Sequence, residues 1–162
     1  MRRSDLVPDC ASCAALCCVA TSFDASEDFA FSKRAGERCR YLLPDCRCAI
    51  HADLAARGFR GCAVYDCYGA GQRATREYAG QQETFLVLHE IHELLWLLTE
   101  AMKLCPAWEA ELHADFAREI AALDAVAPRE ENVPGQRSAT SALLARLAIA
   151  LGGMRGSMLP SD

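Results

Sequence analysis

The chain has 162 residues with 52% hydrophobic content, which fits one domain, or one core with an appended lobe, and excludes a disordered chain. Its longest apolar run, residues 91–98, is interrupted by His92 and Glu93, so no stretch approaches the ~20 residues that a membrane span needs. The net charge of −5 divides into +2 over residues 1–76, with eleven Lys and Arg against nine Asp and Glu, and −7 over residues 77–162, which leaves no basic face adequate for nucleic acid.

Residues 1–72 are expected to form a loop-rich lobe. Residues 12–20 predict a short helix, and residues 49–57 predict another that ends at Gly58. Residues 62–68 resemble a strand, with Val64 and Tyr65, and close on the turn signal Gly69-Ala-Gly71. Large aliphatic and Phe side chains are few and dispersed here, so a lobe of this kind needs a staple, and a metal can supply the missing folding free energy.

Residues 73–162 are expected to form a three-helix part. Residues 84–104 lack Gly and Pro and predict a long helix, whose buried stripe is spaced 3, 4, 3, 4: Leu88, Ile91, Leu95, Leu98 and Met102. Residues 107–126 predict a second helix with one apolar face: Trp108, Leu112, Phe116, Ile120 and Leu123. A polar linker over residues 128–137 precedes a third helix, capped by Ser138 and stopped by Gly152-Gly153.

Ten cysteines are the most unusual feature of the chain, and nine of them fall within the first 67 residues. Buried cysteines acting as small hydrophobic residues would be scattered, so the clustering indicates disulfides, a metal or iron–sulfur site, or redox catalysis. The N-terminus does not resemble a signal peptide, because Asp5 and Asp9 interrupt it and its apolar stretch is short. We therefore expect a cytoplasmic protein, where disulfides are uncommon and clustered cysteines more often bind metal.

The cysteine spacing favours thiolate coordination. Cys10 and Cys13 form a C-x2-C pair, whose sulfurs can share a metal at ~2.3 Å. Cys17 lies one helical turn after Cys13 and faces the same side, whereas Cys18 points elsewhere and is a candidate for a second site. Structural zinc sites usually combine two C-x2-C pairs, and iron–sulfur clusters accept uneven spacing. The pattern favours a cluster, and zinc stays open because both centres accept four thiolates.

The segments CASCAALCC, ERCRYLLPDCRCAIH and GCAVYDC resemble the YkgJ-type cysteine-cluster family, whose domains are described as zinc- or iron-chelating. The likeness is closest at R-C-x-I, given by Arg47, Cys48 and Ile50. Three residues rather than two precede the Cys pair, and His51 stands where the family has Tyr. The resemblance implies eight metal ligands: Cys10, Cys13, Cys17, Cys18, Cys39, Cys48, Cys62 and Cys67.

Cys46 has no counterpart in that family pattern. The first half of the chain and the helix HELLWLLTEA also resemble the N-terminal region of actinobacterial pentapeptide-repeat proteins, although no such repeats follow here.

Three histidines are further candidate ligands. His51 follows Cys48 closely and can complete a mixed site or donate to a bound sulfur. His89 and His92 are spaced i, i+3 on the long helix, so both can face one metal, yet histidines at the edge of an apolar stripe are ordinarily structural. The string G-x-G-x-x-A at Gly69 fits a turn, because a long helix follows where a dinucleotide fold needs a second strand.

We expect a mainly α protein in which an irregular cysteine-rich metal-binding lobe, residues 1–72, packs on a C-terminal three-helix part, residues 73–162. The expected cofactor is an iron–sulfur cluster, 4Fe-4S, or zinc. The expected function is that of a redox or enzyme-accessory component, and the alternative is a structural zinc module whose helices bind a protein partner. The expected partner is another protein, with no nucleic acid and no membrane, and whether the chain is itself an enzyme stays open.

Overall fold

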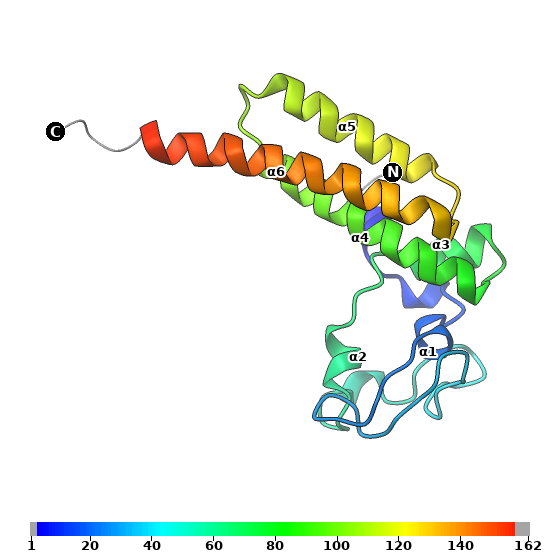
Figure 1. Cartoon of the computed structure of the whole chain (residues 1–162). Coiled ribbons are helices and arrows are strands. Elements are labelled where there is room, and N and C mark those ends of the chain that lie inside the picture. Colours follow the sequence, from blue (N-terminus) through cyan, green and yellow to red (C-terminus); the bar gives the residue numbers. More distant parts are fainter. Residues whose placement is uncertain (1–2, 158–162) are drawn as a thin grey trace. The chain divides into compact units, whose positions relative to one another are not determined.

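The computed structural model describes residues 3–157, which form helices joined by loops (Figure 1). Six α-helices lie within these residues: α1 Cys17–Ala20, α2 Arg60–Val64, α3 Ala70–Glu77, α4 Gln82–Leu104, α5 Ala110–Ala125 and α6 Val133–Ser157. Four 3-10 helices accompany them: η1 Arg3–Leu6, η2 Cys10–Ser12, η3 His51–Asp53 and η4 Glu130–Asn132. The predicted mainly α fold is confirmed. None of the described helices combines the length and the apolar character that crossing a membrane requires.

The chain divides into two compact units. We name Ser4–His89 the cysteine unit, because it carries nine of the ten cysteines, and Arg3 with residues 90–157 the helical unit. The chain passes from one unit to the other inside α4, between His89 and Glu90. The predicted boundary between residues 72 and 73 stays a prediction. The two predicted parts also include residues 1–2 and 158–162, which lie outside the described residues.

The stripe predicted on the long helix is confirmed from Leu88 to Leu98, whereas Met102 is only half-buried. Ile91, Leu95 and Leu98 on α4 have no exposed surface, and neither have Phe116 and Leu123 on α5. Burying each such side chain stabilises the fold by about 1.5–3 kcal/mol. Helix α5 runs beside α6, as Figure 1 shows.

The second predicted helix begins later than expected. α5 starts at Ala110, and the preceding turn is closed by the Glu109 N–H, which donates to the Pro106 carbonyl over 2.9 Å. Trp108 lies in this turn and is 69% exposed, so its place on the buried helix face was wrongly predicted.

The third predicted helix is longer than expected at both ends. α6 begins at Val133 rather than after Ser138, and it continues through Gly152 and Gly153. Pro134 does not prevent the early start, because the first N–H groups of a helix have no intrahelical partner. Glycine inside a helix costs only about 1 kcal/mol relative to alanine, so it weakens a helix without ending it.

In the cysteine unit, one small apolar core joins α1, α3 and the first turns of α4. Its buried members are Leu16, Ala20, Ala70, Ala74, Phe85 and Leu88. Helix α3 was not predicted as a helix. It follows Gly69, whose φ of +77° is a left-handed conformation that glycine adopts at little cost. A Cβ at Gly69 would stand 2.0 Å from the Asp5 carbonyl oxygen, so this turn requires glycine.

A second core consists of aromatic rings from the loops. Phe59 is 2% exposed, and its ring centroid lies 5.1 Å from that of Phe31 and 5.6 Å from that of Tyr41. Phe23 stacks on Phe29 at 4.4 Å and contacts Phe31 at 5.6 Å. Such pairs contribute about 0.5–1.5 kcal/mol each beyond their burial. The predicted scarcity of apolar packing in this lobe therefore needs correction, because five aromatic side chains from distant positions converge.

Three local predictions in the cysteine unit were wrong. Residues 49–57 form one 3-10 turn, His51–Asp53, and further turns that end at Gly58. Residues 60–64 form the short helix α2 instead of a strand, and Val64 is 82% exposed, since no neighbouring strand covers it. Residues 12–20 divide into η2 and α1 because Ala15, with a φ of +56°, interrupts the helix.

Candidate metal centre

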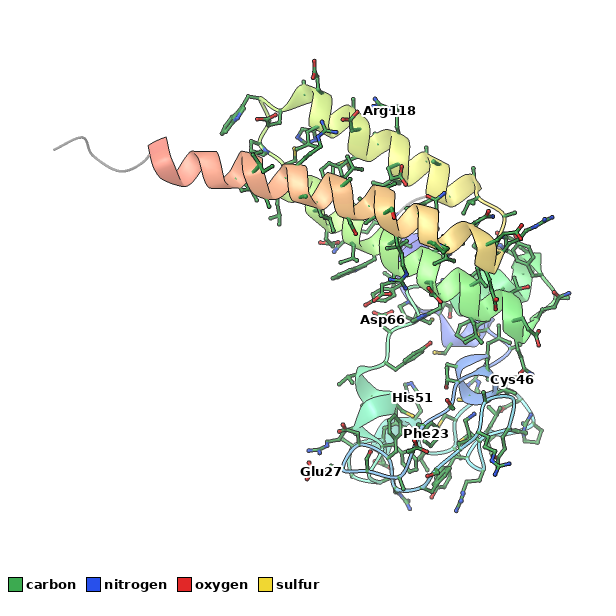
Figure 2. All side chains as sticks on the ribbon, viewed as in Figure 1. Phe23, Glu27, Cys46, His51, Asp66 and Arg118 are labelled. Carbon is green, nitrogen blue, oxygen red and sulfur yellow. The ribbon has the colours of Figure 1, made fainter. Side chains whose placement is uncertain are left out.

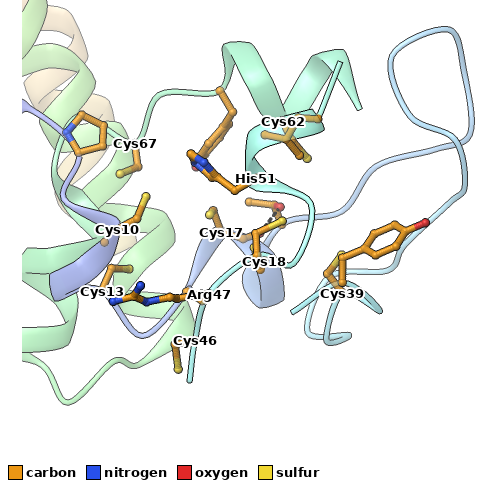
Figure 3. Close-up of a pocket in the computed structure, with 18 of the residues that line it drawn as sticks. Cys10, Cys13, Cys17, Cys18, Cys39, Cys46, Arg47, His51, Cys62 and Cys67 are labelled. Carbon is orange, nitrogen blue, oxygen red and sulfur yellow. Dashed lines mark hydrogen bonds between the residues drawn. The ribbon is translucent and has the colours of Figure 1, made fainter. Parts of the chain in front are cut away.

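Nine cysteines line one cavity of about 590 Å³ in the cysteine unit (Figure 3). They are Cys10, Cys13, Cys17, Cys18, Cys39, Cys46, Cys48, Cys62 and Cys67. All eight predicted ligands therefore line this cavity, and so do Cys46 and His51. All ten thiols of the chain are free, and Cys105 is buried in the helical unit.

Helix α1 carries the adjacent pair Cys17 and Cys18, and polar contacts hold its C-terminal end. The Thr21 hydroxyl donates to the Cys17 carbonyl over 2.7 Å, and the Cys39 N–H donates to the Cys18 carbonyl over 3.0 Å. The Val19 carbonyl accepts from the Gly36 N–H at 2.9 Å. These bonds satisfy carbonyls that the end of a short helix leaves unpaired, and they fix the position of both thiols.

Lys33 adds a buried cation at the same place. It is 3% exposed, and its ammonium donates to four backbone carbonyls, those of Val19, Thr21, Arg34 and Glu37. A positive charge at the C-terminus of a helix is also favoured by the helix dipole. Lys33 therefore ties the loop that follows α1 to the helix bearing Cys17 and Cys18.

The segment with Cys10 and Cys13 is anchored to α3. Gln72 accepts from the Asp9 N–H over 2.6 Å and donates to the Val7 carbonyl over 3.0 Å. The Asp9 carboxylate caps η2 by accepting from the Ala11 N–H at 3.0 Å. After Cys13, the Ala14 N–H donates to the Thr75 hydroxyl over 2.9 Å.

Cys67 lies at the start of α3, where backbone N–H groups face its sulfur. The N–H groups of Gly69 and Gly71 hydrogen-bond to this thiol and oppose the effect of burial, which raises the pKa of Cys67. A Cβ at Gly71 would lie 2.7 Å from the Cys13 sulfur and 3.9 Å from the Cys67 sulfur. The absence of a side chain at Gly71 therefore leaves room for these two thiols.

Cys39 and Cys48 come from a tight hairpin. The Leu43 N–H donates to the Arg47 carbonyl over 2.8 Å, and an isolated antiparallel bridge pairs Leu42 with Cys48. Cys46 occupies the turn with a φ of +64°. The Leu42 N–H donates to the Cys39 carbonyl over 3.0 Å, which closes a turn between Cys39 and the hairpin.

Burial and the charges of nearby thiols change the pKa of several cysteines. Burial raises the pKa of Cys62 to about 11, and the charges of Cys18, Cys39 and Cys48 contribute. Burial likewise raises the pKa of Cys48, with Cys18 and Cys39 adding to the effect. A hydrogen bond from Cys17 lowers the pKa of Cys18 to about 7, and Lys33 acts in the same direction.

The thiols on the side of α3 interact in the same way. Burial raises the pKa of Cys10, and the charges of Cys67, Cys13 and Cys18 contribute next. The hydrogen bond to Cys18 raises the pKa of Cys17, followed by burial and by the charges of Cys18, Cys13 and Cys67.

The remaining walls of the cavity are mostly apolar. They include Phe23, Phe29, Phe59, Tyr65 and Phe85, so both small cores of the unit reach the cavity. The His51 ring points into the cavity, as Figure 3 shows. Apolar walls limit the access of water and lower the local polarity, which strengthens interactions between thiolates and a cation.

The donor set fits a thiolate-bound metal group. Soft thiolates are the ligands of iron–sulfur clusters and of structural zinc. One zinc ion brings four sulfurs to within ~3.8 Å of one another, as its bond length requires, whereas a cluster places its irons and sulfides between them. Among the side chains of the described residues, no group of three or more His, Cys, Asp or Glu is arranged so that it could hold a metal ion.

His89 and His92 on α4 lie outside the lining of the cysteine cavity. The His89 ring nitrogen lies 3.0 Å from the Asp66 carbonyl oxygen, and the ring stacks on Tyr65 with centroids 5.4 Å apart. His92 belongs to the helical unit and is 1% exposed. Neither lines the cavity, and their reading as structural residues stays a prediction.

Several residues that shape the cavity were missed from the sequence. Lys33, Gln72 and Thr75 act on the backbone of distant cysteine segments, and no local pattern marks such contacts. The aromatic residues did leave a signal, because rings recur between the cysteines from Phe23 to Phe59. Figure 2 shows Phe23 and His51 in the same irregular part of the cysteine unit.

Comparison with known proteins places few limits on the function. No family model matches the chain, and no solved structure matches it. A curated relative from Bacillus subtilis (strain 168), named Uncharacterized protein YybG, is 42% identical over 113 residues. The match covers 62% of this chain and 40% of that protein, so the chain spans about two fifths of the relative's length.

Proposed function

We propose that this protein binds metal through the cysteine cavity and serves as a redox or enzyme-accessory component. The observation that carries the proposal is the convergence of the eight predicted ligands on one cavity, although they are spread from Cys10 to Cys67 in the sequence. Free thiols suit a reducing compartment such as the cytoplasm. The cysteine spacing also supports membership of the YkgJ-type family as part of the proposal.

An iron–sulfur cluster is favoured over zinc as the bound group. The cavity of about 590 Å³ provides space between the thiols, which a cluster needs for its irons and sulfides and a single tetrahedral ion does not. When bound, a cluster supplies one-electron redox chemistry, with a potential set by hydrogen bonds to sulfur and by solvent exposure.

The chain's own residues have definable tasks in this role. The thiolates bind, the backbone N–H groups of Gly69 and Gly71 donate to the Cys67 sulfur, and Lys33 provides positive charge next to Cys18. The aromatic residues around Phe59 make part of the cavity wall apolar.

A second candidate function is a structural zinc module whose helices bind a protein partner. Exposed apolar side chains in the helical unit favour it, since Leu104, Trp108 and Ile149 are 65%, 69% and 75% exposed. An exposed apolar side chain is available for contact with a partner protein. In this case the metal only folds the cysteine unit and carries no electrons.

Anaerobic purification followed by elemental analysis and visible spectroscopy tests the proposal. We expect several irons with matching acid-labile sulfide per chain and broad absorption near ~400 nm that bleaches on reduction. Zinc without absorption supports the structural module instead. Protein that contains no metal and has its thiols paired as disulfides contradicts both candidates.

A further inference from the structure

The cysteines that line the cavity can be divided into two groups by the contacts of the segments that carry them. Cys17 and Cys18 are consecutive on α1, where successive side chains point about 100° apart. Their thiols are hydrogen-bonded to each other, but only Cys17 packs against the small apolar core that Cys13 and Cys67 also contact, so we assign the two cysteines to different groups. Figure 3 shows Cys10, Cys13 and Cys67 gathered on the side of α3, and Cys18, Cys39 and Cys62 away from it.

The first group surrounds the start of α3. Cys13 and Cys67 both have their sulfurs within 3.9 Å of the position that a Cβ on Gly71 would occupy. Cys13, Cys17 and Cys67 also pack against the same small apolar core. Cys10 opens η2, which contacts α3 and is held there by Gln72. We name these four thiols the α3 set: Cys10, Cys13, Cys17 and Cys67.

The second group is built around the hairpin. The Cys39 N–H is bonded to the Cys18 carbonyl, and the Leu42 N–H is bonded to the Cys39 carbonyl. Leu42 pairs with Cys48 across the hairpin, which brings Cys48 to the same side. Cys62 on α2 completes the group, because it lines the same cavity and Figure 3 shows it away from Cys10, Cys13 and Cys67. We name these four thiols the hairpin set: Cys18, Cys39, Cys48 and Cys62.

We propose that the cavity holds two separate metal centres, one bound by the α3 set and the other by the hairpin set, an inference that rests on the metal binding proposed above. Each set supplies four thiolates, the full complement of a closed tetrahedral ion or of a four-iron cluster. Cys46 belongs to neither set, because it occupies the hairpin turn. Both centres are closed, so neither offers a coordination position for a substrate.

Titration of the metal-free, reduced chain with Co²⁺ tests the inference on the unaltered protein. After each addition, accessible thiols are alkylated and mapped by mass spectrometry. We expect saturation at two Co²⁺ per chain with eight protected thiols, and at half saturation the protected thiols belong to complete sets. Saturation at one ion with four protected thiols, or protection of four thiols drawn from both sets, overturns the two-centre assignment while metal binding itself stands. Failure to bind any Co²⁺ contradicts the proposed function as well.

Paired substitutions provide the matching test on protein purified with its native metal. Cys13→Ser with Cys67→Ser removes only the α3 set, and Cys39→Ser with Cys62→Ser removes only the hairpin set. Each double variant is expected to keep about half of the metal, with the four thiols of the other set protected. The controls Cys46→Ser and Cys105→Ser are expected to keep all of it. Retention of all metal by either double variant overturns the assignment.

Discussion

Substituting Gly71 with alanine tests the role of the α3 set without removing a ligand. The new Cβ would stand 2.7 Å from the Cys13 sulfur, whereas non-bonded heavy atoms prefer about 3.5–4.0 Å. The sulfur must therefore move by roughly 1 Å, through a rotation of its side chain that costs about 0.5–1.5 kcal/mol. The alanine also favours helix α3 by about 0.5–1 kcal/mol relative to glycine.

These contributions nearly cancel in the metal-free protein, but they do not cancel when Cys13 is a ligand. Without metal, the thermal midpoint should change by no more than about 2–4 °C, the shift that 1 kcal/mol produces in a chain of this size. With metal, the displaced sulfur should weaken one of the two centres about 10–100-fold, as occurs when the support of a ligand is altered. The hairpin set should bind as before.

Competition between Co²⁺ and a chelator measures both affinities, and differential scanning calorimetry measures the midpoint. Gly135→Ala on α6 is the control, since no atom lies within 4 Å of its added methyl group. If Gly71→Ala binds two ions with unaltered affinity, or weakens the hairpin set instead, the geometry assigned to Cys13 and Cys67 is wrong.

Three further substitutions probe the rest of the cysteine unit and the long helix. Lys33→Met removes an ammonium bonded to four carbonyls. It should lower the free energy of unfolding in urea by about 3 kcal/mol or more, because hydrogen bonds to charged groups contribute about 1.5–3 kcal/mol each. An unchanged urea midpoint contradicts a stabilising role for these four hydrogen bonds. Phe59→Ala should destabilise the unit by about 3–5 kcal/mol and reduce the near-ultraviolet circular dichroism of the aromatic cluster, and a spectrum identical to the wild type refutes the packing. His89→Ala should leave the metal content unchanged, because its ring bonds the Asp66 carbonyl; loss of metal, by elemental analysis, would make the long helix part of the site.

The sequence predicted which distant residues gather in this chain better than it predicted the local backbone. The stripe from Leu88 to Leu98 has a strong period and is buried as expected. The spacing of the cysteines and their family resemblance selected eight residues that all line one cavity. Such signals depend on residue type and on repetition, both of which are visible without a structure.

Local predictions failed where contacts from distant residues determine the backbone. Residues 62–68 alternate like a strand, but a strand needs a neighbour to pair with, and here Gly61 instead packs beneath Phe29 at the start of a short helix. Likewise, α3 follows a left-handed glycine and carries Gln72, which holds a segment more than sixty residues earlier. Neither contact can be predicted from the residues that neighbour Gly61 or Gln72 in the sequence.

The nine reduced thiols that line one cavity make the purified protein sensitive to oxidation. When metal leaves in the presence of an oxidant, neighbouring thiols can lose two protons and two electrons to it and close a disulfide. The hydrogen bonds of Lys33 and the contacts among the aromatic rings involve none of the thiols, so we expect them to keep those sulfurs close together after the proposed metal has gone. We therefore expect loss of the proposed metal in air to be irreversible until a reductant opens the disulfides again.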